Sequence, residues 1–226
     1  MILVRHGRTS ANVGGVLAGR TPGVRLDDTG VAQAERTAAR LAPVPLAAVV
    51  SSPLERCRQT AQAVVRAQTA ALRVATDRGL TECDYGDWQG RPLKELAKEP
   101  LWKVVQTQPS AATFPGGESL ASMQARVVDA VRRRDAAVEA EHGPGAVWVA
   151  VSHGDLVKAL LADATGSGLP HFQRYTADPA SVSAIRYGGR HTFLLAANDL
   201  ASDLARFQPP QEAPASGDAA VGGGAG

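Results

Sequence analysis

Two His-Gly pairs, His6-Gly7 and His153-Gly154, each follow a short apolar segment of the chain. An imidazole can act as a nucleophile or carry a proton near neutral pH, and glycine lets backbone or ligand come close. One histidine after a strand is more often structural than catalytic. Two such pairs in equivalent positions instead favour a catalytic site built from both rings.

Arginines accompany these histidines. Arg5 directly precedes the first one, and Arg56 falls in the first turn of a predicted helix that follows an apolar segment. A helix N-terminus together with guanidinium groups suits a phosphate-like dianion. The alternative is that Arg56 is an ordinary exposed residue. Arg58, two positions later, should point elsewhere, because residues i and i+2 do not share a helix face.

Apolar periodicity and helix start signals predict the elements that would position these side chains. Strands are predicted at residues 1–4, 46–50, 72–75 and 146–151, and a hairpin at 182–187 and 191–195 that turns at Gly188 and Gly189. Helices are predicted at residues 31–41 after N-cap candidates at 27–29, from 53 onward, at 118–141 and at 155–165. Residues 52–55 read as a capping box with proline at the first helical position. The stretch 79–117 reads as loop-rich, with a short helix at 94–105.

Strands that alternate with helices favour an α/β fold. The expected architecture is a three-layer sandwich with a mainly parallel central sheet of about six strands, helices on both faces and one antiparallel strand. Residues 1–207 should form a single domain, and residues 208–226, rich in Pro, Gly and Ala, a disordered tail. Ligands of such sheets bind beyond the carboxyl ends of the strands, where both His-Gly pairs should lie.

The composition excludes several classes of protein. The 226 residues are 44% hydrophobic and 20% charged, with a formal net charge of +2, which fits a globular chain and does not predict nucleic-acid binding. No apolar run reaches the ~20 residues that span a bilayer, and no leader precedes His6, so a cytoplasmic protein without membrane contact is predicted. The two cysteines, Cys57 and Cys83, make no disulfide framework and fit a reducing compartment.

Six blocks of sequence occur in a characteristic order. They are residues 5–9 with Asn12, 26–34, 51–61, 80–90, 115–119 and 151–154. Together they resemble the histidine phosphatase superfamily, which includes the cofactor-dependent phosphoglycerate mutases. The resemblance runs from Met1 to about Leu195 and is nearest to an uncharacterised actinobacterial branch labelled as phosphomutases.

The resemblance implies roles for the matching residues. His6 attacks phosphorus and becomes a phosphohistidine, while Arg5, Arg56 and His153 hold the phosphoryl oxygens. Glu82 protonates the leaving oxygen and then activates water. Further candidates for substrate binding are Asn12 and the backbone around Gly19 and Arg20. The resemblance implies no metal ion and no other cofactor.

The residue chemistry agrees with these roles. Positive charge beside His6 should lower its pKa and favour the neutral, nucleophilic ring. Fixed cations also stabilise the nearly dissociative transition state of phosphoryl transfer. Without the resemblance, Glu82 would read as a surface carboxylate, and Asp155 would read as a cap of the helix after His153.

Four activities are compatible with these motifs. A phosphomonoester hydrolase is favoured over a phosphomutase, because residues 91–114 are short and carry only Lys94, Lys98 and Lys103 to retain a bisphosphate. A non-catalytic protein that binds phosphorylated ligands would not need both histidines and the carboxyl. A metallohydrolase is disfavoured because the arginines would repel a cation. The predicted partner is a small phosphorylated metabolite.

Overall fold

The structure is a computed structural model that describes residues 1–188 and 190–200. Residues 201–207 of the predicted domain, the predicted tail at 208–226 and Gly189 of the predicted hairpin turn lie outside the described residues. The strands form one sheet and are β1 (Ile2–Arg5), β2 (Leu46–Ser51), β3 (Val74–Thr76), β4 (Val147–Ser152), β5 (Val182–Tyr187) and β6 (Thr192–Asp199).

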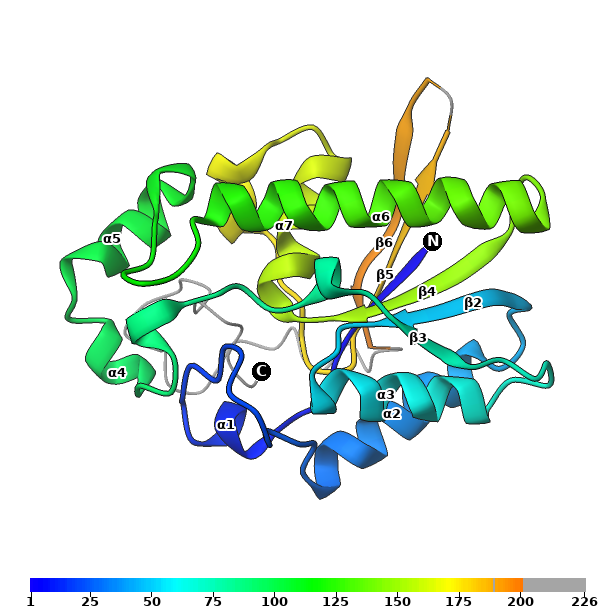
Figure 1. Ribbon diagram of the computed structural model, residues 1–226, viewed down its shortest axis with the longest axis horizontal. Coiled ribbons are helices and arrows are strands. Elements are labelled where there is room, and N and C mark those ends of the chain that lie inside the picture. The colour runs from blue at the N-terminus through cyan, green and yellow to red at the C-terminus, as the bar shows by residue number, and fades with distance from the viewer. Residues whose placement is uncertain (189, 201–226) are drawn as a thin grey trace, which may run out of the picture.

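The sheet is mainly parallel, and its order β3-β2-β4-β1-β5-β6 places β1 in the interior (Figure 1). The first four strands of this order pair in parallel, whereas β5 pairs antiparallel with both β1 and β6. Among the described strands, β5 alone therefore runs against the others, which confirms the prediction. Arg5 pairs with Ser152 across β1 and β4, so the chain leaves these two strands at the same level.

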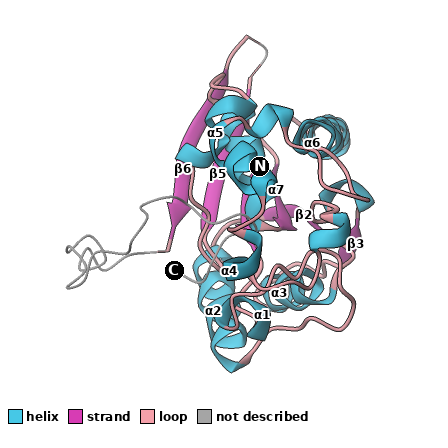
Figure 2. Cartoon of the chain, turned by 90° about the vertical axis from the view of Figure 1, so that its left-hand side faces the viewer, coloured by secondary structure: helices cyan, strands magenta, loops and turns pink. Residues whose placement is uncertain are grey.

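Helices cover both faces of the sheet, as Figures 1 and 2 show. The long ones are α2 (Asp28–Leu41) and α3 (Glu55–Arg66) on one face, and α6 (Leu120–His142) and α7 (Gly154–Ala164) on the other. Successive strand residues feed two separate cores, because side chains alternate across a strand. Leu3 packs with the residues of α6 and α7, and Val4 packs with those of α2 and α3. The predicted three-layer architecture is confirmed.

The start of α3 differs from the predicted capping box. The helix begins at Glu55, and its N-cap residue, Leu54, makes no side-chain cap. The Ser52 hydroxyl accepts a hydrogen bond from the Leu54 amide at 3.4 Å and lies 2.8 Å from Nε2 of His153. The predicted box is wrong because this serine lies before the helix and contacts a histidine from another strand.

The segment between β3 and α6 is mostly irregular, as predicted, but the helix expected at 94–105 is two helices. Pro100 starts the second, since proline fits a first helical turn but cannot continue a helix. The short elements of the chain are α1 (Ser10–Val13), α4 (Leu93–Leu96), α5 (Pro100–Thr107) and the 3₁₀ helices Arg78–Leu80, Gly86–Trp88, Pro109–Ala111 and Leu169–Arg174. Of the helices described, none combines the length and apolar character needed to cross a membrane.

A close backbone approach joins the turn after β1 to the start of α2. A methyl group on Gly7 would lie 2.4 Å from the carbonyl oxygen of Gly30, and one on Gly30 would lie 2.0 Å from that of Arg8. Asp27 caps α2 by accepting from the Gly30 amide at 2.7 Å and also pairs with Arg8 at 2.9 Å. The two glycines therefore let α2 sit directly against the turn that carries His6.

Candidate active site

The two predicted histidines lie side by side at the carboxyl edge of the sheet. His6 follows β1 and His153 follows β4, and these strands are neighbours. Their ring centroids are 5.3 Å apart at an interplanar angle of 66°. Both rings are buried, with His6 4% exposed and His153 fully enclosed. Parallel pairing thus brings together two residues that are far apart in the chain.

Hydrogen bonding fixes which nitrogen of His6 is free to react. Nδ1 lies 2.7 Å from the Gly7 carbonyl oxygen, which can only accept, so Nδ1 carries the proton. Nε2 therefore holds the lone pair, and the Arg56 Nε–H donates to it at 3.2 Å. The Gly7 amide in turn donates to the hydroxyl of Thr60 in α3, which fixes this turn. The neutral ring is thus presented with its nucleophilic nitrogen toward Arg56.

Arg56 links both rings from the first turn of α3. Its Nη2 donates to Nδ1 of His153 at 3.2 Å and to the Gly19 carbonyl at 2.7 Å. The side chain is buried, and its Nη1 has no hydrogen-bond partner among the described residues. Reading Arg56 as an ordinary exposed residue is therefore wrong. A buried guanidinium nitrogen without a partner, beside two imidazoles, suits an incoming anionic oxygen.

Arg5 supplies the second predicted cation. It is 1% exposed, and its Nη1 donates to the Ala177 carbonyl at 2.6 Å. Burial first, then the charges of Arg56 and Arg5, lower the pKa of His6 well below its ordinary value. Burial and Arg56 likewise lower the pKa of His153. Both rings are consequently neutral across the physiological pH range, which is the form in which an imidazole can act as a nucleophile.

Glu82 lies inside the site and is not the surface carboxylate that its sequence position alone would allow. It is 3% exposed, and its Oε2 lies 3.7 Å from Nδ1 of His153. Its Oε1 accepts from the Cys83 amide at 3.0 Å. Burial first, and then the negative charge of Asp155, raise the pKa of Glu82 to about 7. A carboxyl group with this pKa can both donate and accept a proton near neutrality.

The lesser predicted substrate-binding residues, Asn12, Gly19 and Arg20, make hydrogen bonds within the protein. Asn12 accepts from the Thr9 amide through its Oδ1 at 3.0 Å, which caps α1. The Arg20 amide donates to Gln89 at 2.7 Å, and its guanidinium donates to the Glu82 carbonyl at 2.8 Å. Gly19 offers a carbonyl to Arg56, as described above. In this structure Gly19 and Arg20 therefore position Arg56 and Glu82.

Two parts of the site escaped sequence reasoning. Ser52 contacts Nε2 of His153, and since Nδ1 accepts from Arg56, the Nε2–H of the neutral ring is the donor to its hydroxyl. Asp155 does not cap α7, because its Oδ2 accepts from the Tyr85 hydroxyl at 2.6 Å. Both residues follow parallel strands, Ser52 within a matched block and Asp155 directly after one, which is the signal that could have found them.

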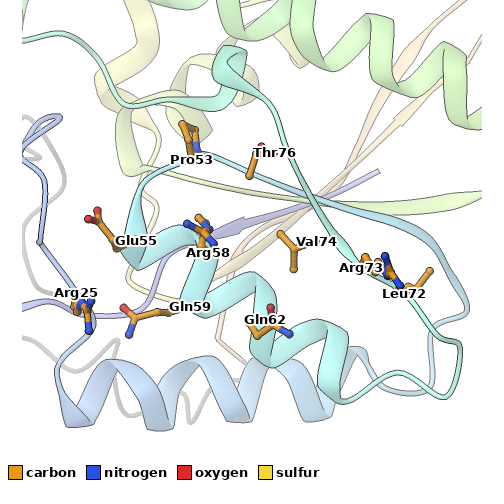
Figure 3. A pocket seen from close by; sticks show the side chains of 10 residues that line it. All are labelled: Arg25, Pro53, Glu55, Arg58, Gln59, Gln62, Leu72, Arg73, Val74 and Thr76. Carbon is orange, nitrogen blue, oxygen red and sulfur yellow. The ribbon is translucent and has the colours of Figure 1, made fainter.

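Figure 3 shows a hollow whose lining contains neither histidine. It measures about 830 Å³ and is lined by Arg25, Pro53, Glu55, Arg58, Gln59, Gln62, Leu72, Arg73, Val74 and Thr76. The exposed Arg58 lines this hollow, whereas Arg56 lies between the rings. The prediction that Arg58 points elsewhere is confirmed. Among the described residues, no group of three or more His, Cys, Asp or Glu side chains is arranged to hold a metal ion.

Comparisons with known proteins agree with this geometry. Residues 1–200 match the family described as histidine phosphatase superfamily (branch 1). An uncharacterised protein of Mycobacterium bovis is 36% identical over 190 residues, which cover 83% of this chain and 50% of that protein. The chain thus spans about half the length of this relative. The similarity to an uncharacterised mycobacterial protein agrees with the resemblance to an uncharacterised actinobacterial branch.

Two further relatives are named as phosphatases. Phosphoserine phosphatase 1 of Hydrogenobacter thermophilus is 32% identical over 207 residues, which cover 88% of this chain and 91% of that protein. The solved structure of the mycobacterial glucosyl-3-phosphoglycerate phosphatase in complex with VO₃ is 27% identical, with a TM-score of 0.78. That similarity covers 88% of this chain and 98% of the solved one.

Proposed function

The chain belongs to the histidine phosphatase superfamily, and we propose that it is a metal-independent phosphomonoester hydrolase that forms a phosphohistidine on His6. The observation that carries the proposal is the buried Nη1 of Arg56, which has no partner among the described residues and lies on the guanidinium that joins both histidines. A phosphoryl oxygen would complete its hydrogen bonding. The phosphatase names of the two relatives above support hydrolysis as the class of reaction.

The first half-reaction transfers the phosphoryl group to the protein. Nε2 of His6 attacks phosphorus, the bond from phosphorus to the leaving oxygen breaks, and the carboxyl proton of Glu82 moves to that oxygen. Arg56 donates to Nε2 in the free protein, so a phosphoryl oxygen must take over this guanidinium as the substrate enters. The charges of Arg56 and Arg5 stabilise the remaining negative charge. His153, a neutral ring whose Nδ1 accepts from Arg56, orients that guanidinium.

The second half-reaction releases phosphate. The Glu82 carboxylate takes a proton from water as the water oxygen attacks phosphorus, and the bond between phosphorus and Nε2 breaks. His6 returns to its neutral form and Glu82 regains its proton. A pKa of about 7 suits Glu82 for both directions of proton transfer.

The same residues would serve a phosphomutase, so the fate of the phosphoryl group decides between the two reactions. Lys94, Lys98 and Lys103 are exposed on or between α4 and α5. Three exposed lysines on short helices are a poor clamp for the second acidic group of a bisphosphate. We therefore propose water as the acceptor and a small phosphorylated metabolite as the substrate class.

The test measures release of inorganic phosphate from p-nitrophenyl phosphate in the presence of EDTA. We expect turnover to persist in chelator, His6→Ala to abolish it, and Arg56→Ala to reduce kcat/KM by about 10³-fold. Arg58→Ala is the matched control on the same helix. It should retain the activity of the unmodified protein, since Arg58 lines the hollow of Figure 3, whose lining contains neither histidine.

Three outcomes would overturn the proposal. Loss of all turnover in EDTA would indicate a metallohydrolase. Near-normal turnover by His6→Ala would remove the assigned nucleophile. Rapid isomerisation of 3-phosphoglycerate with added 2,3-bisphosphoglycerate, with little free phosphate, would indicate a phosphomutase.

A further inference from the structure

A second buried polar cluster lies directly behind the reacting groups and has no part in the steps above. Asp155 and Tyr85 are fully enclosed, and Lys158 is 2% exposed. The Tyr85 hydroxyl donates to Oδ2 of Asp155 at 2.6 Å, and Nζ of Lys158 lies 3.6 Å from Oδ1. Burying a carboxylate and an ammonium is costly, so their retention here calls for a physical reason.

This cluster connects the two segments that carry Glu82 and His153. Glu82 faces His153. Three residues after Glu82, the Tyr85 hydroxyl donates to Asp155, which lies two residues after His153 on the other segment. The segments therefore contact each other at two successive points, both closed to solvent. A shift of the loop that bears Glu82 would have to break the bond between Tyr85 and Asp155.

The side chain of Asp155 is held in place by its surroundings. It is the second residue of α7, where the helix dipole stabilises negative charge, and Lys158 lies one turn later. The ammonium of Lys158 is itself fixed by Gln173 at 2.6 Å and lies 4.1 Å from the centre of the Phe172 ring. The charge of Asp155 thus has a defined place close to the active site.

The charged groups that act on Glu82 come from three elements. Arg5 on β1, Arg56 on α3 and Lys158 on α7 are cations that favour its ionised form. Asp155 is the opposing anion. The other titratable neighbours are neutral near pH 7, because burial raises the pKa of the tyrosine and the thiols and lowers that of the imidazole; they are Tyr85, Cys57, Cys83 and His153.

We infer that Asp155 is a positioning residue that keeps the proton on Glu82 and holds the Glu82 segment against His153. This inference rests on the proposed role of Glu82 as the proton donor. With Glu82 protonated, the three cations and Asp155 carry two net positive charges, which match a phosphoryl dianion. Without Asp155 the excess of positive charge would lower the pKa of Glu82, so that its carboxyl group would lose the proton before the substrate binds.

The test follows single-turnover phosphorylation of the protein by glycerol 2-phosphate against pH. This alkyl ester is chosen because its leaving oxygen needs a proton. The rate should fall as the pH rises through the value at which Glu82 loses its proton. Asp155→Asn should move this fall to lower pH by about one unit, and Lys158→Met should move it to higher pH.

The combined variant Asp155→Asn/Lys158→Met separates charge from structure. It removes one charge of each sign, so the fall in rate should return to the pH of the unmodified protein even if the absolute rate is lower. Tyr85→Phe removes the hydrogen bond without changing charge and should lower the rate with a much smaller shift in pH.

The inference would be overturned if the phosphorylation rate of both single variants fell at the same pH as that of the unmodified protein. It would also be overturned if the pH of this fall were shifted further in the combined variant than in either single variant. If Asp155→Asn does not fold, Lys158→Met alone decides, since an unshifted fall contradicts the inference. Failure of the proposed function looks different, because the unmodified protein would then form no phosphohistidine or would show no fall that depends on Glu82.

Discussion

Glu82 combines a buried position with a proton that it holds until near neutral pH. The dominant cause is burial, and Asp155 adds to it, whereas Arg56 and Arg5 act in the opposite direction. These opposing effects leave the pKa of Glu82 at about 7, above that of an exposed carboxyl group but still near neutral pH. The residue can therefore return to its starting state after each turnover.

The need for this proton depends on the leaving group. Glu82→Gln should reduce the phosphorylation rate with glycerol 2-phosphate by about 10²- to 10³-fold, since an alkoxide is a poor leaving group. With p-nitrophenyl phosphate, whose phenolate leaves unaided, the loss should be at least tenfold smaller. Because the pKa is raised, activity toward the alkyl ester should be full below pH 7 and fall above it. Single-turnover assays of both esters between pH 5 and 9 measure these effects.

Asp87→Asn provides the control for this variant. Asp87 is an exposed carboxylate five residues later, so its replacement should leave both rates unchanged. An equal loss for the two esters in Glu82→Gln would contradict the role of Glu82 as proton donor. Such a result would fit a carboxyl that serves only to hold the site together.

At the residue scale, sequence reasoning placed the reacting groups but not the contacts that tune them. Histidines and arginines can be identified from their types and from the ends of predicted strands. Ser52 and Asp155 could not be assigned, because each has an ordinary local explanation as a helix cap. Only tertiary pairing reveals that Ser52 contacts His153 and that Asp155 contacts Tyr85.

Among the elements, the contact between α2 and the turn after β1 sets the position of His6, the proposed nucleophile. The backbone of Gly30 touches that of Gly7 and Arg8 so closely that neither glycine has room for a side chain. His6 belongs to this same turn. A shift of α2 would therefore displace Nε2 of His6 relative to Arg56 on α3.

Gly30→Ala should disrupt this contact. The added methyl group would meet the Arg8 carbonyl oxygen at 2.0 Å, and the backbone cannot yield without moving α2. We expect the free energy of unfolding to fall by about 3 kcal/mol and kcat to fall with it. Urea denaturation and steady-state assays measure the two effects.

Thr29→Ala is the control on the same turn. Thr29 is exposed, so its replacement should change the free energy of unfolding by no more than about 0.5 kcal/mol. Equal stability of the two variants would show that the close approach can be relieved at little cost. The proposed link between α2 and His6 would then be wrong.

The predicted helices and strands agree with the structure where they rest on a periodic pattern of apolar residues. The predicted helix boundaries are wrong where they rest on one or a few residues near a helix end. The long helix from Leu120 follows its apolar face, and the strands follow their apolar runs. The boundary at Glu55 was misplaced because a tertiary contact takes the hydroxyl of Ser52. Pro100 starts a new helix within the segment that was predicted as one.

For the molecule as a whole, the buried guanidinium of Arg56 supplies a preorganised donor for an anion. Binding of a dianion to the folded state alone must therefore stabilise it. Inorganic phosphate at 100 times its Kd should add about 2.7 kcal/mol to the free energy of unfolding. For a chain of this size, that corresponds to a rise of about 5 to 10 °C in Tm.

Thermal melts with and without phosphate check this prediction. Arg56→Ala should lose most of the rise, whereas Arg58→Ala should retain it because its guanidinium lies outside the histidine pair. A similar rise in both variants would show that phosphate binds elsewhere on the protein.

The overall architecture was predictable because alternation of strands and helices leaves few arrangements of a parallel sheet. The predicted sandwich, its antiparallel strand and the meeting of both histidines at one edge all agree with the structure. Strand order was not predictable, since residues 1–4 contain nothing that selects β4 and β5 as neighbours. That choice depends on contacts between distant parts of the chain.

The order of the strands also determines when the protein can first work. β1 precedes both of its sheet neighbours in the sequence, because β4 and β5 come from the last third of the described chain. A nascent chain that ends at residue 140 of this sequence contains His6 but neither His153 nor the two strands that flank β1. Under the proposed function, activity requires β4 and β5 to have joined β1, so the return of phosphate release during refolding would report completion of the centre of the sheet.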